Sequence, residues 1–150
     1  MRVIQGLAGI EELVGQELGI SDWLQIDQER IQRFADATGD QQWIHVDPVR
    51  AAQGPYGKTI AHGYLTLSLL PLLSSQVYQV DGLKMTMNYG LEKVRFPAVV
   101  PVGSRLRNRP VLVSLIGTKA GTQALVRHTL ELEGSERPAC VAEQIRLMVA

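Results

Sequence analysis

The sequence is poor in cysteine, in aromatic residues and in net charge. Its 150 residues contain one cysteine, Cys140, so an internal disulfide is impossible, and this favours a reducing, cytoplasmic setting. Fifteen Lys and Arg balance fifteen Asp and Glu. A chain without a net field gives no electrostatic reason to expect nucleic acid or an anionic membrane surface as a partner.

Long hydrophobic runs are also missing. The longest apolar run, residues 64–73, contains a threonine, a serine and a proline, whereas a bilayer-spanning helix needs about 20 apolar residues. Near the N-terminus, Glu11, Glu12 and Glu17 interrupt any apolar core of a secretory signal. We therefore expect neither a membrane span nor a signal peptide.

The length and the 45% hydrophobic content fit one globular domain spanning residues 1–150. Local signals place three helices in the first third of this domain. Apolar residues at three- and four-residue spacing predict a helix over residues 7–18. Asp27 can cap a second helix, which should end at Gly39. An aspartate followed by Pro48 starts a third, short helix over about residues 48–53.

A fourth helical segment, from about His62 to Val77, is apolar on almost every side. A helix without a polar face is usually buried. Pro71 lies inside this segment and should kink it or remove one backbone hydrogen bond. We expect this helix to form the centre of the core.

The second half of the chain has the pattern of long strands separated by short turns. The expected strands cover residues 83–96, 104–116, 123–133 and 140–149, with turns at 117–121 and 134–138. Helices followed by strands with tight connections favour an α+β fold with an antiparallel sheet over a doubly wound parallel sheet. The arrangement predicted is a curved antiparallel sheet wrapped around the central buried helix.

Asp40 and His45 are the first candidates for chemistry. Asp40 follows the end of the second helix, and His45 lies five residues later in the same loop. A histidine can exchange a proton near neutral pH, and a nearby carboxylate can orient it or a water molecule. The alternative is structural, since short-range Asp/His pairs are common: Asp40 would be a loop residue and His45 a capping or partly buried histidine.

Gly63 is the third candidate. If the buried helix starts here, the Gly63 amide is one of its unpaired N–H groups and can bind a carbonyl oxygen that becomes negative during a reaction. Glycine also lets a ligand approach closely. The alternative is that Gly63 eases tight packing and that His62 caps the helix.

Two segments then resemble a known family. TGDQQWIHVDP holds Gly39-Asp40 and Ile44-His45, and TIAHGYLTLSLLP holds Gly63. Together they resemble the MaoC-like dehydratases, the (R)-specific enoyl-CoA hydratases, which have a hotdog fold. The resemblance runs from about residue 20 onward.

One departure from the family motif narrows the resemblance. Gln42-Trp43 stands where the family usually has Asn-Pro, which is similar to the subgroup that contains nodulation protein N-like and mycobacterial hydratase proteins. Residues 88–90 (NYG) and 94–97 (VRFP) also resemble that subgroup. The departure affects the loop shape and pocket size more than the chemistry.

The resemblance implies roles for the matching residues. Asp40 and His45 would hold and activate the water that adds to a trans-2-enoyl thioester, with either one as the acid or the base. The Gly63 N–H would bind the thioester oxygen, and the product would be a (3R)-hydroxyacyl-CoA. No metal, flavin or nicotinamide cofactor is implied. Although histidines and aspartates lie close in this segment, it has no HExxH motif and no Cys/His ligand set.

Five further residues are candidates for substrate binding. Trp43 and Tyr64 could line the acyl pocket or pack in the core, and His62 could contact substrate or cap the helix. Asn88 could reach the site or cap an extended turn. Arg95 could bind the phosphates of coenzyme A, because arginine suits phosphate, or belong to a solvated strand face.

We also expect a homodimer, because pairing of an exposed edge strand is the family's solution and would cover that edge. Two other functions compete with hydration. One is thioester hydrolysis, which other hotdog proteins perform. The other is a non-catalytic subunit that binds acyl thioesters.

Overall fold

The computed structural model describes all 150 residues. It contains two sheets and six short helices. The elements are β1 (Arg2–Gln5), α1 (Gly6–Glu11), β2 (Leu24–Gln25), α2 (Gln28–Thr38), α3 (Trp43–Val46), α4 (Pro48–Ala52), α5 (Gly63–Ser68), α6 (Leu70–Ser75), β3 (Tyr78–Asp81), β4 (Met85–Arg95), β5 (Arg105–Thr118), β6 (Gly121–Leu132) and β7 (Cys140–Val149).

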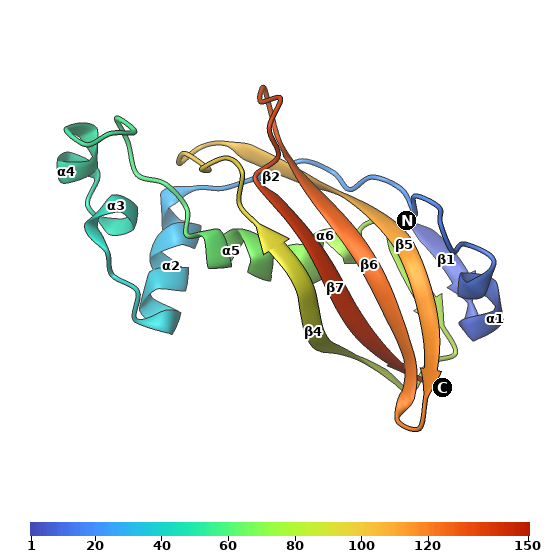
Figure 1. Ribbon diagram of the computed structural model, residues 1–150. Helices are drawn as coiled ribbons and strands as arrows, with labels where there is room; N and C mark the ends of the chain where they lie inside the picture. The colour runs from blue at the N-terminus through green and yellow to red at the C-terminus, as the bar shows by residue number, and fades with distance from the viewer.

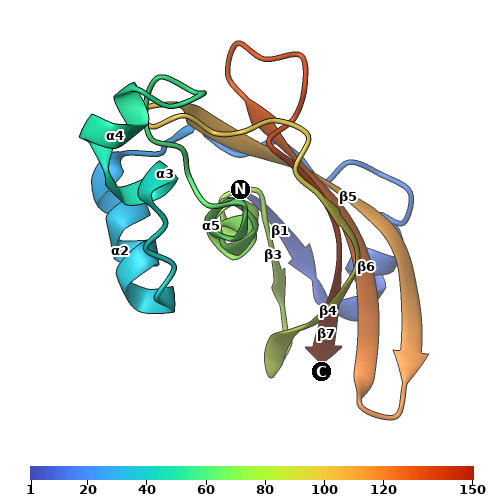
Figure 2. The ribbon, with the colours of Figure 1, turned by 60° about the vertical axis from the view of Figure 1, so that its left-hand side comes forward.

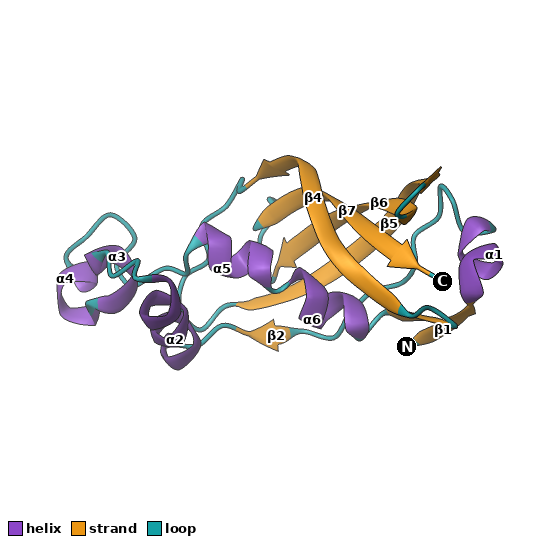
Figure 3. Ribbon diagram, turned by 90° about the horizontal axis from the view of Figure 1, so that it is seen from below, coloured by secondary structure: helices purple, strands orange, loops and turns teal.

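A five-stranded antiparallel sheet in the order β2-β5-β6-β7-β4 dominates the fold. Figure 1 shows this sheet as a long curved surface, and Figure 2 shows it curling around α5. Figure 3 shows α5 and α6 lying in the hollow, with α2, α3 and α4 gathered at one end and α1 at the other. The predicted α+β class and the predicted sheet wrapped around a helix are confirmed.

The four long strands lie where the alternation of residues placed them. The β5–β6 hairpin is tighter than expected, because Thr118 pairs with Gly121 and only two residues turn the chain. Gly121 has φ 140°, and a Cβ there would lie 2.4 Å from the carbonyl oxygen of Met148. Only glycine fits so close to the neighbouring strand, so the turn depends on this residue.

The central helix is divided into α5 and α6 at Leu69, as Pro71 suggested. Its core side is buried, with Leu65, Leu70 and Leu73 at 5% exposure or less. The expectation that the helix is buried on all sides is wrong for the single chain, because Tyr64 is 72% and Leu72 is 42% exposed. The sheet covers one side of the helix and leaves the other open.

The first helix is shorter than predicted. α1 ends at Glu11, and residues 12–19 instead run beside β5, where the amide of Gly15 donates to the carbonyl of Leu112. Leu13 and Leu18 are still buried, so the apolar spacing marked core residues but not a helix. The parallel pair β1–β3 was not predicted.

The helix caps agree with the sequence. Asp27 Oδ1 accepts from the amide of Arg30 at the start of α2, and Asp47 does the same for Arg50 at the start of α4. Gly39 ends α2 in the left-handed conformation with φ 81°, which glycine adopts without strain. These caps fix the two ends of the loop that carries Asp40. No helix is long and apolar enough to cross a membrane.

Candidate active site

The loop from Gly39 to α4 brings Asp40 and His45 to the N-terminal end of α5. The chain leaves α2 at Gly39, and His45 lies in the last turn of α3. A segment just before α5 is pinned on both sides: the amide of Ile60 donates to the carbonyl of Ile44, and the amide of Ala61 donates to the carbonyl of Val100. The loop and the start of α5 are therefore held as one unit.

The imidazole of His45 is buried and fixed in one tautomer. Its Nδ1 lies 2.7 Å from the carbonyl oxygen of Ile60, and because a carbonyl can only accept, Nδ1 carries the proton. Nε2 therefore has a free lone pair. The backbone of His45 is held as well, since Gln28 Nε2 donates to its carbonyl over 2.8 Å and Thr59 in turn donates to Gln28.

His62 lies flat against His45. The ring centroids are 3.7 Å apart and the planes differ by 23°, while Phe34 packs on His62 at 4.9 Å. His62 Nε2 donates to the backbone carbonyl of Asp40 over 3.0 Å. Its Nδ1 is buried and has no hydrogen-bond partner. His62 thus connects the Asp40 loop to the start of α5.

The environment keeps His45 neutral. Burial lowers the pKa of His45 below its ordinary 6.5, and the charge that His62 can carry lowers it further. The hydrogen bond to Ile60 and the carboxylate of Asp40 act in the opposite direction but are outweighed. At neutral pH this imidazole is a proton acceptor at Nε2.

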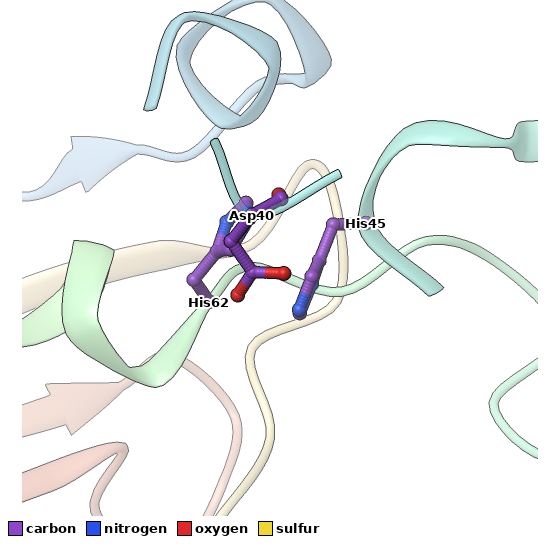
Figure 4. Close-up of side chains that lie close together, drawn as sticks. All are labelled: Asp40, His45 and His62. Atoms are coloured by element: carbon purple, nitrogen blue, oxygen red, sulfur yellow. The ribbon is translucent and has the colours of Figure 1, made fainter. Parts of the chain in front are cut away.

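Asp40 supplies the only carboxylate of this cluster and is exposed. Figure 4 shows it turned towards the ring of His45, with His62 beside them. A carboxylate oxygen and one nitrogen of each histidine all lie within 4.8 Å of one another. One water molecule can therefore contact both Asp40 and His45.

Asp40, His45 and His62 are also residue types that bind metal ions. Metal ligands of a tetrahedral site must direct their lone pairs to one point at about 2.0–2.1 Å. The two imidazoles are stacked, so their lone pairs lie in nearly parallel planes and do not converge. One nitrogen of each ring is also committed to a backbone carbonyl. The geometry suits proton transfer better than metal binding.

Gly63 is the first residue of α5, where the helix makes no use of its N–H. It lines a cavity of about 240 Å³ together with His45, Thr66 and Phe96. A Cβ at position 63 would lie 3.2 Å from Cδ2 of Phe96, so the absence of a side chain keeps this end of the cavity open. A ligand oxygen bound at the Gly63 amide would therefore lie in the cavity that His45 also lines.

The structure brings only some of the predicted residues together. Asp40, His45, His62 and Gly63 gather at one place, whereas Trp43 packs on Gly54 and under the guanidinium of Arg50. Tyr64 is exposed and touches Phe96 edge-on at 6.4 Å. Asn88 lies further along β4 and accepts from Gln144. Arg95 is exposed, and its guanidinium donates to the carbonyl of Val94.

Sequence reasoning missed the residues that hold the site. Gln28 and Thr59 anchor His45 from positions 17 and 14 residues away along the chain, and the Ile60 carbonyl sets its tautomer. Phe96 closes the cavity from the end of β4. No local pattern marks these residues, because each acts through a contact that only the fold creates.

Comparison with known proteins places this geometry in a family. The sequence matches the model of the MaoC-like domain over residues 10–133. The 3-hydroxyacyl-thioester dehydratase Z of Mycobacterium tuberculosis (strain ATCC 25618 / H37Rv) is 56% identical over 151 residues, covering 100% of both chains. Nodulation protein N of Rhizobium leguminosarum bv. viciae is 44% identical over 146 residues, covering 95% of this chain and 90% of that protein.

The fold comparison agrees. R-hydratase PhaJ1 from Pseudomonas aeruginosa superposes with a TM-score of 0.74 at 21% identity, over 91% of this chain and 81% of that chain. This likeness confirms the hotdog fold, and the sequence matches confirm the resemblance to the dehydratases. The chain therefore belongs to the MaoC-like family and is an enzyme of the hydro-lyase type.

Proposed function

We propose that the protein is an (R)-specific enoyl-CoA hydratase/dehydratase, which adds water to a trans-2-enoyl-CoA to give a (3R)-hydroxyacyl-CoA. The observation that carries the proposal is the meeting of three groups: the free Nε2 of His45, the Asp40 carboxylate and the unused amide of Gly63. The printed name of the mycobacterial relative, a 3-hydroxyacyl-thioester dehydratase, supports the same chemistry. The proposed setting is the cytoplasm.

In the proposed reaction, a water molecule lies between Asp40 and His45. His45 Nε2 takes a proton from this water as its oxygen bonds to C3 of the enoyl group, and the imidazolium then returns a proton to C2. The Asp40 carboxylate orients the water and stabilises the imidazolium. The net reaction adds one water, as a hydroxyl at C3 and a hydrogen at C2. Dehydration follows the same path in reverse.

The Gly63 amide has the third role. As water attacks C3, negative charge moves to the thioester oxygen, and an N–H already fixed at that position stabilises it without reorganisation. The amide is held by the pinned segment before α5. Because His45 and Gly63 line one cavity, the thioester and the attacked carbon can be bound together.

The test uses purified protein and crotonyl-CoA, with loss of the conjugated thioester absorbance as the signal. Asp40→Asn and His45→Gln should each lower kcat by about 10²–10⁴-fold with little change in the thermal unfolding midpoint. Arg137→Met, an exposed residue in the β6–β7 turn, serves as the control and should keep the wild-type rate. An unchanged rate in either site variant would remove the role given to that residue.

The same assay separates the competing functions. Release of free coenzyme A thiol in place of hydration would identify a thioesterase. Binding of acyl-CoA by the wild type with no turnover, and equal binding by both site variants, would identify a non-catalytic binding subunit. Hydration is favoured because the Asp40–His45 spacing matches the motif of the dehydratase family.

We also propose that two copies form a homodimer through β4. This edge strand has 11 residues and presents a row of exposed apolar side chains, and the open side of the central helix adds two more. These residues are Met85, Met87, Tyr89, Leu91, Tyr64 and Leu72. A long apolar edge favours pairing with a second copy. Light scattering should give twice the chain mass of 16.5 kDa, and a mass of one chain would contradict the dimer.

A further inference from the structure

Three cavities lie along the central helix. The first contains His45 and Gly63. The second, of about 390 Å³, lies one turn further along the helix, between Leu67 and Pro71 on one side and the middle of β4 on the other. The third, of about 230 Å³, lies beyond Pro71. The second and third cavities share Pro71, Asn88 and Gln144, so they adjoin each other and are called the groove below, whereas neither shares a lining residue with the first cavity.

The cavities differ in polarity, from apolar at His45 to polar beyond Pro71. The cavity at His45 is lined mainly by apolar side chains such as Phe96 and Val99. The far cavity has only three apolar residues among eleven. Ser74 and Gln144 face it and are only 3% and 7% exposed. Buried polar groups need hydrogen-bond partners. The donors and acceptors of Ser74 and Gln144 that have no partner in the chain therefore indicate which ligand groups the cavity can bind.

A chain of hydrogen bonds crosses the inner face of four strands and ends in this cavity. Asn108 on β5 donates through Nδ2 to His128 Nδ1 on β6, over 3.1 Å. His128 Nε2 donates to Gln144 Oε1 on β7, over 3.2 Å. Gln144 Nε2 donates to Asn88 Oδ1 on β4, over 3.0 Å. At the last residue, Asn88 Oδ1 accepts one hydrogen bond, and the two N–H groups of Asn88 Nδ2 donate to no other group of the chain.

Two further donors lie at the far cavity, beside Tyr78, Gln79 and Thr86, whose oxygens can also accept hydrogen bonds. Ser74 Oγ accepts from Asn108 Nδ2 over 3.2 Å, which leaves its hydroxyl proton to be given away. Arg146 donates one N–H to the hydroxyl of Tyr78 over 2.8 Å and has further N–H groups to offer.

Arg146 also differs from the arginines on the outer face of the sheet. The strand arginines there pair with glutamates: Arg105 with Glu133, Arg107 and Arg109 with Glu131, and Arg127 with Glu143. Arg146 has no carboxylate partner, and no carboxylate lines the cavity. The far end of the groove thus holds several free donors and one positive charge without a carboxylate partner.

We infer that this groove binds the part of the acyl group remote from the thioester, and that its far end recognises a hydrogen-bond acceptor there, a carboxylate in preference to a neutral carbonyl. The inference rests on the proposed function for the position of the thioester at Gly63. Its own content is the donor set of Ser74, Asn88 and Arg146, which a plain hydrocarbon chain would leave unmatched. The substrate class is then an enoyl thioester with a second, distal acidic group.

The dimensions set the chain length to be tested. From Gly63 to Pro71 and Ser74 the helix advances about 12–16 Å at about 1.5 Å per residue. An extended chain covers about 3.5 Å in three bonds, so an acyl chain of about 10–14 bonds reaches the donors. A dodecenoyl chain falls in this range, whereas the crotonyl group is too short to enter the far cavity.

The experiment compares three substrates: crotonyl-CoA, trans-2-dodecenoyl-CoA and trans-2-dodecenedioyl-CoA, which carries a carboxylate at its far end. We expect KM for the diacid to be about tenfold or more below that of the plain chain, because a hydrogen bond to a charged group in a partly buried site discriminates by at least this factor. Arg146→Met should abolish the difference and leave the crotonyl-CoA rate unchanged. Arg146→Gln, which keeps donors without the charge, should retain a smaller preference for the diacid than the wild type.

The outcomes are separable. Equal KM values for the diacid and the plain chain in the wild type would overturn the inference, as would a preference that survives in Arg146→Met. If crotonyl-CoA is not hydrated, the proposed function fails, and the groove is then tested by calorimetry with saturated dodecanoyl-CoA and its diacid analogue. If Arg146→Met does not fold, Asn88→Leu at the exposed end of the hydrogen-bond chain tests the same preference.

Discussion

His45 and His62 stack with their ring centroids 3.7 Å apart, and each ring donates to a backbone carbonyl of the other's segment. His45 donates to Ile60, two residues before His62, and His62 donates to Asp40, five residues before His45. The two contacts tie the loop of Asp40 to the start of α5 from both directions. We infer that His62 is a positioning residue, which acts on the proposed site through Asp40 and His45.

Substitution of His62 separates its two contacts. His62→Phe keeps a flat ring against His45 but removes the part-buried hydrogen bond to the Asp40 carbonyl, so the Asp40 loop should lose its position and kcat should fall about tenfold. His62→Gln keeps an N–H near the position of Nε2 and should retain most of the rate. The measurement is kcat and KM with crotonyl-CoA, with KM expected to change little. Wild-type kcat in His62→Phe would show that the Asp40 contact has no part in catalysis.

The pH profile of hydration reports the state of His45. Burial disfavours the imidazolium, so the pKa of His45 lies below 6.5, and the neutral base persists to lower pH than an ordinary histidine would. We expect kcat/KM to stay level at neutral pH and to fall with acid only below pH 6.5. In His62→Gln the acid limb should shift to a slightly higher pH. This variant removes the charge of His62, which lowers the pKa of His45, whereas burial, the largest cause, remains. An acid limb above pH 6.5 in the wild type would contradict this assignment.

Local chemistry decided which parts of the fold the sequence could predict. Asp27, Gly39 and Asp47 each act on a backbone group within four residues, so their caps were readable. The helical spacing continues to Leu18, but the amides of Gly15 and Leu18 donate to carbonyls of β5. Such a choice between a helix and a neighbouring strand depends on a segment about 95 residues away, which periodicity does not reveal.

The candidate site shows the same division. Asp40, His45 and Gly63 could be proposed from spacing and from the predicted start of a helix. The stacking of His62, the support from Gln28 and the long donor chain to Asn88 depend on contacts between different elements. The position of Arg146 on the inner face follows from the register of β7, which a sequence pattern leaves undetermined because both faces of that strand are partly buried.

Gly63 offers a test of the cavity itself. A Cβ at this position would lie 3.2 Å from Phe96, so Gly63→Ala must displace the ring or the start of α5. Crowding of this kind costs about 1–3 kcal/mol, and we expect kcat/KM to fall about tenfold or more, with the amide itself still present. Phe96→Leu alone should have a smaller effect, and the double variant should recover part of the loss. Wild-type kinetics in Gly63→Ala would show that the thioester does not use this end of the cavity.

His128 should make stability depend on pH. It is fully buried, and burial lowers its pKa from 6.5 to about 4, with the positive charge of Arg146 acting in the same direction. Between these two values the unfolded chain binds a proton that the folded protein does not, so the free energy of unfolding decreases as the pH falls from 6.5 towards 4, by about 3 kcal/mol. His128→Gln can keep one donor and one acceptor for the chain between Asn108 and Gln144 but cannot titrate. Urea unfolding at a series of pH values should therefore give a wild-type minus variant difference that shrinks by about 3 kcal/mol between pH 7 and pH 4. A constant difference would show that His128 has the same pKa in the folded protein as in the unfolded chain, and a difference that grows towards pH 4 would show that it is protonated when folded.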